Sequence, residues 1–391
     1  MALLFPRIRY QCGQPPLGML YLAAHLRHHT DAQVDVFDLT FQKKPSEYVR
    51  QIVSDTKYDI TGVSVMTSMA PEAFEISHLI KEINRDTFMI WGGPHATVVP
   101  DEVLSDESVD AVAVGEGENT ITGLVRNGGN PSEIPGIWYK NSGGTIIKNE
   151  PVTLASDLSG LPWPARESID MESYMRKWYT ISGWGPGLRG TSLIASRGCP
   201  FHCTYCQPTL DLLFGKKVRR RNVDDILGEL LHLKKTYAIN AAFFEDDTFI
   251  LNRRWVHEMC DKMKESGLNL KWGCNARANS IDEDLISKMA ASGLVQLNIG
   301  IESATQRILD DVYDKGITVD DVRRAVQIGR RFGVKMCGYV MIGAPTETIQ
   351  EINNTIRFVN KLPLDEISYS ITTPLPGTRL WSKTQGMIKK S

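Results

Sequence analysis

Short apolar runs alternate with helical patterns through the first third of the chain. Runs typical of buried strands occupy Ala2–Phe5, Gln33–Phe37, Asp59–Val65, Phe88–Trp91 and Val109–Val114. Between them, apolar residues recur with helical spacing over Leu17–Arg27, Ser46–Asp55, Pro71–Asn84 and Glu118–Arg126. Strands that alternate with helices predict a parallel sheet covered by helices. Five such units predict a doubly wound α/β domain over residues 1–127.

The alternation of strands and helices stops after residue 127 and resumes near residue 189. Residues 128–188 contain the turn signals Gly128–Pro131 and Asn141–Gly144 around a small predicted hairpin, and we assign them to a linker. A second α/β region spans 189–385. Its predicted strands are 191–196, 240–246, 270–276, 294–301, 334–342 and 366–371. Its predicted helices are 223–237, 252–266, 281–291, 304–312, 319–332 and 347–361.

Composition narrows the class of protein. The chain has 391 residues, with 44 basic and 46 acidic side chains and a formal net charge of -2. This balance gives no reason to expect nucleic acid as a partner. No apolar run approaches the roughly 18 residues of a membrane span, and the N-terminus does not resemble a signal peptide. We therefore expect a cytoplasmic protein.

Three cysteines form the most specific motif of the chain. Cys199, Cys203 and Cys206 have the spacing C-x3-C-x2-C directly after a predicted strand. Thiolates select iron–sulfur clusters, copper(I) or zinc. A zinc site with His202 as fourth ligand is the alternative, but structural zinc sites normally use two separated ligand pairs. A [4Fe–4S] cluster normally takes four cysteines, so three would leave one iron open.

This motif resembles the signature of the radical S-adenosylmethionine (AdoMet) enzymes. The resemblance implies that the open iron binds AdoMet and that the cluster cleaves it to a 5'-deoxyadenosyl radical. The six β/α units are similar to the partial (β/α)6, TIM-like barrel of that family. In such barrels, working residues follow the carboxyl ends of the strands.

The resemblance assigns further AdoMet-binding residues to the other strand ends. These are Glu245, Asp246 and Asp247 for the ammonium group, Arg277 for the carboxylate, Glu302 and Ser303 for the ribose and methionine parts, and Gly343 and Tyr205 beside adenine. Two alternatives stay open: the three acids could simply start a helix, and Arg277 could pair with them.

Special residues also follow the strands of the first domain. They are Gly13, Thr67, Ser68, Gly92, Gly93, His95, Gly115, Glu116 and Gly117. Glycines allow close approach of a ligand to the backbone, and ligands of flavodoxin-like (Rossmann-like) sheets bind at this edge. The turns resemble those of the cobalamin-binding domain found in one class of radical AdoMet enzymes. The D-x-H-x-x-G motif is absent, so cobalt would receive no histidine from it; His95 is either a cofactor contact or a loop histidine.

We therefore expect an enzyme with a [4Fe–4S] cluster, AdoMet and cobalamin, which methylates an unactivated carbon. The resemblance is nearest to the branch with the anaerobic magnesium-protoporphyrin ester cyclase and hopanoid enzymes. It implies a small-molecule, lipid or tetrapyrrole substrate and a flavodoxin or ferredoxin as electron donor. Radical cyclisation or rearrangement without methyl transfer is the alternative reaction, and a corrinoid sensor or carrier is the alternative class. Relatives usually continue beyond the sixth barrel strand, so the chain is either short or a fragment.

Overall fold

The computed structural model describes residues 1–9, 11–178, 184 and 187–387. The chain divides into two compact units, which exchange short segments along the sequence. The first unit contains Met1–Ser156, Gly160–Lys177 and Thr209–Gly215. The second unit contains Asp157–Ser159, Trp178–Pro208 and Lys216–Ser391.

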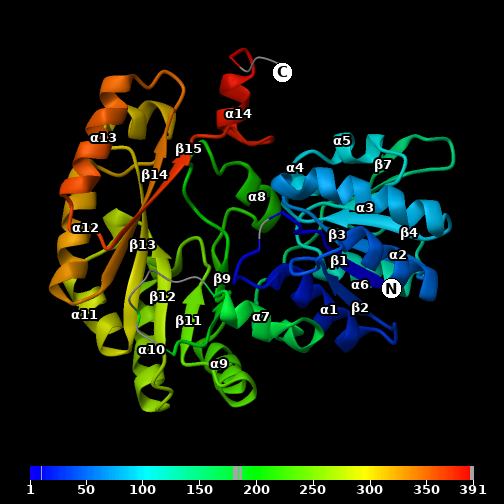
Figure 1. Ribbon diagram of the computed structural model, residues 1–391, viewed down its shortest axis with the longest axis horizontal. Coiled ribbons are helices and arrows are strands. Elements are labelled where there is room, and N and C mark those ends of the chain that lie inside the picture. The colour runs from blue at the N-terminus through cyan, green and yellow to red at the C-terminus, as the bar shows by residue number, and fades with distance from the viewer. Residues whose placement is uncertain (10, 179–183, 185–186, 388–391) are drawn as a thin grey trace. The chain divides into compact units, whose positions relative to one another are not determined.

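The first unit is built on a seven-stranded sheet with the order β2-β1-β3-β4-β5-β6-β7 (Figure 1). The strands are β1 (Ala2–Phe5), β2 (Asp35–Asp38), β3 (Ile60–Ser64), β4 (Phe88–Gly92), β5 (Ala111–Ala113), β6 (Ile137–Lys140) and β7 (Ile146–Lys148). The first five are parallel to one another. Their order, 2-1-3-4-5, is that of flavodoxin-like sheets, which confirms the predicted fold.

Helices cover this sheet as the apolar periodicity predicts. They are α1 (Leu17–His29), α2 (Pro45–Asp55), α3 (Ala70–Ile83), α4 (Pro94–Val98), α5 (Pro100–Ser105), α6 (Glu118–Arg126) and the later α7 (Met171–Arg176) and α8 (Thr209–Phe214). Helix α1 packs against α6, and α2 packs against α3. Buried residues of the strands and helices form one apolar core.

The predicted linker is wrong in its first half, because the hairpin belongs to the sheet. Strand β6 pairs antiparallel with β5, so that Val112 lies opposite Trp138, and β7 pairs with β6. Without β6, the edge of β5 would expose unpaired backbone groups. In addition, Ile137 of β6 adds a fully buried side chain to the core. The segment 160–177 also belongs to the first unit, where the Tyr174 hydroxyl donates to Asp38 at 2.6 Å.

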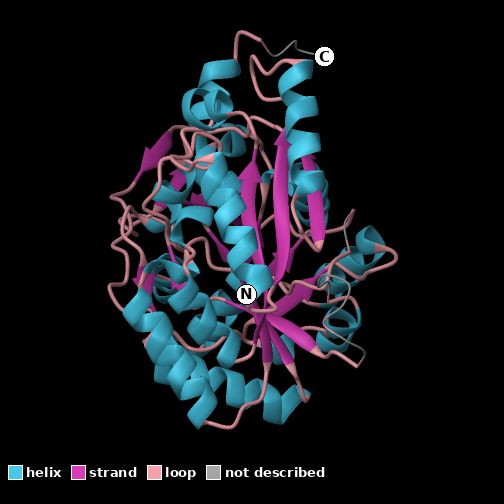
Figure 2. Ribbon diagram, turned by 90° about the vertical axis from the view of Figure 1, so that its left-hand side faces the viewer, coloured by secondary structure: helices cyan, strands magenta, loops and turns pink. Residues whose placement is uncertain are grey.

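The second unit contains a six-stranded parallel sheet with the order β15-β14-β13-β12-β11-β8. Its strands are β8 (Gly190–Leu193), β11 (Ala241–Phe244), β12 (Lys271–Ala276), β13 (Leu294–Glu302), β14 (Lys335–Ile342) and β15 (Glu366–Ile371). Its main helices are α9 (Val223–Tyr237), α10 (Arg253–Glu265), α11 (Glu283–Ala291), α12 (Val319–Arg331) and α13 (Ile349–Lys361). The helices lie along one face of the curled sheet (Figures 1 and 2). This confirms the predicted partial barrel.

Some elements of the second unit differ from the prediction. The stretch predicted as a helix over 304–312 is a π-helical segment at Ile308–Val312. A two-stranded ribbon of β9 (Ser196–Arg197) and β10 (Arg219–Arg220) flanks the cysteine loop, and α14 (Arg379–Thr384) follows the last strand. Within the described part of the chain, no helix is long and apolar enough to cross a membrane.

Candidate functional site

The cysteine loop follows β8 and is fastened to its surroundings by backbone hydrogen bonds. The Thr204 amide donates to Tyr313 O at 2.8 Å, and the Thr204 hydroxyl donates to Val312 O at 2.6 Å. The Leu380 amide in turn donates to Thr204 O at 2.9 Å. The Thr248 hydroxyl donates to Gly198 O at 3.2 Å at the start of the loop. These bonds place the three cysteines at the carboxyl end of the parallel sheet, as predicted.

The three thiols share a partly dry environment. Cys203 is buried, while Cys199 and Cys206 are half-buried. Burial raises the pKa of Cys199 to about 11 and raises the pKa of Cys206 as well. The Arg277 guanidinium lies 3.7 Å from Cys203 Sγ and stacks on Phe201 at 3.8 Å. The free thiols of Cys199 and Cys206 are therefore protonated, and binding iron would release their protons to solvent.

The donor set fits an iron–sulfur cluster better than a single metal ion. Among the described residues, no three His, Cys, Asp or Glu side chains converge on one ion. A [4Fe–4S] cluster has no such requirement, because each cysteine binds a different iron. His202 is exposed, so the alternative zinc site gains no support. Cys199, Cys203 and Cys206 would hold the cluster.

The three acids after β11 take different positions. Asp246 is buried and accepts hydrogen bonds from the Ala195 amide at 3.0 Å and the Ser196 hydroxyl at 2.5 Å. Burial raises its pKa to about 7. Glu245 is half-buried and Asp247 is exposed. Asp246 therefore anchors the connection from β8 to the cysteine loop, which speaks against its predicted role with the AdoMet ammonium.

Glu302 ends β13 inside a buried ion pair that the sequence did not predict. Lys315 Nζ donates to Glu302 Oε1 at 2.7 Å and to the Tyr205 hydroxyl at 3.0 Å. The Tyr205 hydroxyl in turn donates to Glu302 Oε1 at 3.1 Å. Lys315 and Glu302 are both more than nine-tenths buried. The triad links the loop that carries Tyr205 to the end of β13. In the sequence, Lys315 is a single lysine in a turn, and no motif connects it with Glu302 or Tyr205.

Two other predicted AdoMet residues lie in different surroundings. Ser303 is fully buried and its hydroxyl is within 3.2 Å of the Thr355 hydroxyl on α13; its contact with AdoMet stays a prediction. Gly343 follows β14 with φ 78°, a conformation that favours glycine. Next to it in the chain, Ala344 joins an apolar cluster with partly buried Tyr205 and Met341 packed against it. This apolar lining suits an adenine ring.

The predicted corrinoid residues meet at the carboxyl edge of the first sheet. They follow β1, β3, β4 and β5, which are neighbours in the sheet. Gly93 and Gly115 both have φ 89°. A Cβ at Gly93 would lie 3.0 Å from the Val65 carbonyl oxygen, so the backbones approach closely there. The Gly115 amide donates to the Thr97 hydroxyl at 3.1 Å.

The remaining members of this set differ in exposure. Gly13 and Glu116 are buried, Thr67, Gly92 and Gly117 are half-buried, and Ser68 is exposed. His95 is 5% exposed, and its Nδ1 atom has no hydrogen-bond partner among the described residues. Burial lowers the pKa of His95, so the imidazole is neutral. An orphaned buried nitrogen beside a glycine-rich edge fits a site built for a large polar ligand such as cobalamin.

Helix α8, which the sequence did not predict, packs on α4 next to this edge.

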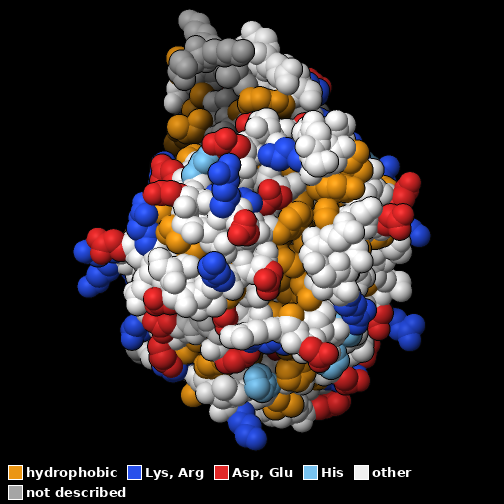
Figure 3. Space-filling view, turned by 90° about the vertical axis from the view of Figure 1, so that its right-hand side faces the viewer, with side chains coloured by type: hydrophobic (Ala, Val, Ile, Leu, Met, Phe, Trp, Pro, Cys, Tyr) orange, Lys and Arg blue, Asp and Glu red, His pale blue; other side chains and the backbone are white. Residues whose placement is uncertain are grey.

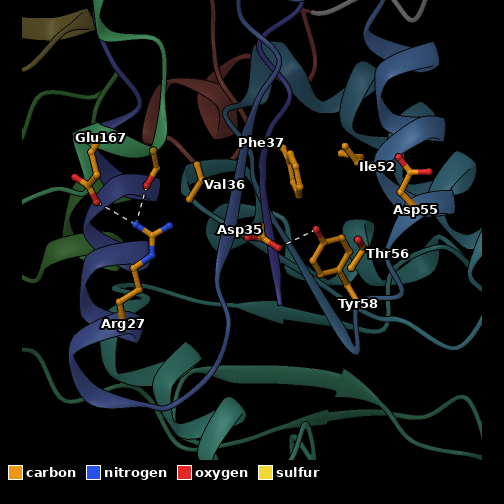
Figure 4. A pocket seen from close by; sticks show the side chains of 10 residues that line it. Arg27, Asp35, Val36, Phe37, Ile52, Asp55, Thr56, Tyr58 and Glu167 are labelled. Atoms are coloured by element: carbon orange, nitrogen blue, oxygen red, sulfur yellow. Dashed lines mark hydrogen bonds and ion pairs between the residues drawn. The ribbon is translucent and has the colours of Figure 1, made fainter.

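A separate recess lies at the opposite end of the first sheet, beside the edge strand β2 (Figure 4). Its charged side chains bond to each other: Arg27 bonds to Glu167 and Ser168, and Tyr58 donates to Asp35 at 2.9 Å. On the face shown in Figure 3, acidic and basic side chains are interspersed. We assign no cofactor to this recess, because Arg27, Glu167, Asp35 and Tyr58 are already paired with one another or with Ser168.

Comparison with known proteins supports the candidate site of each unit. The family model of the B12 binding domain matches residues 10–125, and that of the radical SAM superfamily matches residues 193–359. An uncharacterized methyltransferase of Pyrococcus horikoshii is 34% identical, over 94% of this chain and 78% of that protein. Cytidylyl-2-hydroxyethylphosphonate methyltransferase of Streptomyces wedmorensis is 28% identical, over 96% and 78%.

Two further comparisons concern the reaction branch and the fold. The anaerobic magnesium-protoporphyrin IX monomethyl ester cyclase of Rubrivivax gelatinosus is 25% identical, over 94% of this chain and 66% of that protein. The radical AdoMet methyltransferase TsrM from Kitasatospora setae, solved with cobalamin and a [4Fe–4S] cluster, has the same fold with a TM-score of 0.82. That alignment has 18% identity and covers 99% of this chain and 74% of TsrM. The chain belongs to the cobalamin-dependent radical AdoMet enzymes, whose cofactors are a [4Fe–4S] cluster, AdoMet and cobalamin.

Proposed function

We propose that the protein is a methyltransferase that attaches a methyl group to an unactivated carbon of a small molecule. The observation that carries the proposal is the pairing of a three-cysteine loop with a corrinoid edge in one chain. When bound, the cluster and AdoMet supply a 5'-deoxyadenosyl radical, and cobalamin supplies the methyl group. The methyltransferases among its relatives favour methyl transfer over cyclisation.

The side chains at the strand ends of the second unit would bind and orient AdoMet. Glu245 and Asp247 offer carboxylates to the ammonium group, since Asp246 is held by Ala195 and Ser196. Arg277 lies beside Cys203 and offers its guanidinium to the AdoMet carboxylate. These groups would keep the sulfonium next to the open iron, and small errors of position are costly in rate.

The residues of the first unit would hold cobalamin mainly through backbone and short side chains. Gly93 and Gly115 allow the close backbone packing that shapes this edge, and Thr67 and Ser68 would offer hydroxyl groups. The neutral His95 can donate or accept a hydrogen bond at the cofactor. An electron donor of the flavodoxin or ferredoxin type and a cytoplasmic location complete the proposal.

Labelled AdoMet tests the reaction. The small-molecule fraction of a deletion strain, in which the substrate should accumulate, is incubated anaerobically with reconstituted protein, a reductant and AdoMet with a deuterated methyl group. We expect one product heavier by a deuterated methyl group, together with 5'-deoxyadenosine. Product without label would favour cyclisation or rearrangement. Bound cofactors without any 5'-deoxyadenosine would favour the sensor or carrier.

A further inference from the structure

A continuous chain of hydrogen bonds runs along the second sheet, on the face opposite the helices. The Trp184 indole nitrogen donates to Gln296 Oε1. Gln296 Nε2 donates to Asn298 Oδ1 at 2.7 Å, and Asn298 Nδ2 donates to the Tyr339 hydroxyl at 2.8 Å. We call these four residues the polar ladder.

The pleat of the strands places the polar ladder on the inner face of the partial barrel. Leu297, Ile299 and Val340 are fully buried on the face that the helices cover. Side chains alternate along a strand, so Asn298 and Tyr339 point to the other face. That face would carry apolar side chains if it only had to pack, yet here it carries two amides and a phenol.

The first donor fixes the direction of every bond in the ladder. An indole N–H can only donate, so the Gln296 atom that faces Trp184 must be the oxygen. Gln296 then presents its NH2 group to Asn298, and Asn298 presents its NH2 group to Tyr339. The Tyr339 oxygen accepts, and its own hydrogen points onward.

The last hydrogen of the ladder has no acceptor within the described part of the chain. Gln296 and Asn298 are buried, and buried polar groups are normally hydrogen-bonded. Tyr339, in contrast, is 41% exposed. The ladder therefore delivers an oriented donor to an open position on the inner face, a few residues before the strand end where Gly343 lies.

The charges around Tyr339 restrict what it can bind. Partial burial of Tyr339, together with the nearby Cys337 and Glu245, raises its pKa to about 12. The hydroxyl therefore stays protonated at neutral pH. Glu245 also accepts a hydrogen bond from the Ser192 hydroxyl at 2.6 Å. A carboxylate nearby disfavours an anionic ligand group and leaves an uncharged oxygen acceptor as the suitable partner.

We propose that the polar ladder binds the methyl acceptor, with Tyr339 donating a hydrogen bond to a carbonyl, amide or hydroxyl oxygen of that molecule. This inference rests on the proposed function and narrows its substrate to molecules with an uncharged polar oxygen near the reacting carbon. A lipid or tetrapyrrole would need such an oxygen at that place. Asn298 and Gln296 are positioning residues that aim the hydroxyl.

Two variants and one control test the ladder. Tyr339→Phe removes only the hydroxyl. Asn298→Asp keeps the size but removes the donor to Tyr339, so that the hydroxyl turns inward to the new carboxylate. Tyr369→Phe is the control. Tyr369 is 44% exposed and makes no hydrogen bond among the described residues. It pairs in register with Val340, so its side chain lies on the face of the sheet opposite to that of Tyr339.

The measurement is equilibrium dialysis of anaerobic holoenzyme against the small-molecule fraction of the deletion strain, with bound compounds identified by mass spectrometry. We expect at least one oxygen-containing compound that the parent and Tyr369→Phe retain equally. Both ladder variants should retain roughly tenfold less of it, the effect of one lost hydrogen bond. Iron and cobalamin should be unchanged in both variants, and the melting temperature should be unchanged in Tyr339→Phe. Equal retention by Tyr339→Phe and the parent, or no retention by the parent, would overturn the ladder. Retention without methyl transfer would instead contradict the proposed function.

Discussion

At the end of β13 in the second unit, a buried lysine and a buried glutamate are bonded to each other, whereas the corrinoid edge of the first unit consists mainly of glycines and short side chains. Lys315, Glu302 and Tyr205 form a closed triad. Gly93 and Gly115 instead allow neighbouring protein atoms to approach closely, because an added Cβ would lie 3.0 Å from the Val65 carbonyl oxygen and 3.1 Å from the Val152 side chain, respectively. In the second unit, removing a side chain should therefore leave a partner unpaired. In the first unit, adding a single carbon at one of these glycines should reduce stability and cofactor binding.

The largest effect should come from the cysteine loop. Replacement of Cys203 with Ala should abolish cluster binding and AdoMet cleavage, because each cysteine holds one iron and no spare ligand lies nearby. Iron content and 5'-deoxyadenosine formation measure this in anaerobic protein. Cys260→Ala is the control, since Cys260 lies on α10. Full iron and activity in the Cys203 variant would disprove the cluster assignment.

Breaking the triad of Lys315, Glu302 and Tyr205 should lower the stability of the protein strongly. Replacement of Lys315 with Met leaves Glu302 buried without its cation, and loss of one partner from a buried pair costs about 3–5 kcal/mol. Denaturant unfolding of the anaerobic protein measures this cost. The double variant with Glu302→Gln should regain most of the stability. If the single variant is as stable as the parent, the ion pair does not exist in solution.

In the first unit, Gly93→Ala should reduce stability and cobalamin uptake together. Gly93 has φ 89° and ψ -173°, a backbone region that is essentially restricted to glycine and costs other residues about 1–3 kcal/mol. The new carbon would also press on the Val65 carbonyl oxygen. Gly128→Ala is the matched control, because its φ is 63° and no atom lies within 4 Å of the added carbon. The control should lose stability but bind cobalamin normally. Equal cobalamin uptake by both variants would remove Gly93 from the site.

Asp247→Asn should weaken AdoMet binding on the order of tenfold or more, because hydrogen bonds to charged groups contribute roughly 1.5–3 kcal/mol. Iron content should not change, since Asp247 is not a cluster ligand. Asp246→Asn is the comparison and should leave AdoMet affinity near that of the parent. If the two variants exchange these effects, the carboxylate that faces AdoMet is Asp246.

A further prediction concerns the pH dependence of stability at Asp246. Burial raises its pKa from 3.8 to about 7, so the folded protein binds this proton more tightly than the unfolded chain. Stability from the protonated group is full below pH 3.8 and is lost as the pH rises through about 7. The parent should therefore lose stability relative to Asp246→Asn over this range in urea unfolding. A constant difference would contradict the shifted pKa.

The sequence predicted the strands and the cysteine loop well, because apolar periodicity and ligand spacing are local properties. It failed where a side chain's partner lies far along the chain. Asp246 and Asp247 are adjacent, and only the fold shows which one turns inward to Ala195 and Ser196. Helices α4 and α5 begin at Pro94 and Pro100, residues that also signal turns. The hairpin of β6 and β7 was assigned to a linker because its partner, β5, was already part of a complete α/β pattern.

The central claim, that a 5'-deoxyadenosyl radical removes hydrogen from the carbon that is then methylated, can be measured with deuterium. The deletion strain is grown on deuterated medium, and its small-molecule fraction is incubated with the reconstituted enzyme, a reductant and unlabelled AdoMet. We expect one deuterium in each 5'-deoxyadenosine and one 5'-deoxyadenosine for each methylated product. A methylated product that forms while 5'-deoxyadenosine stays free of deuterium would contradict it.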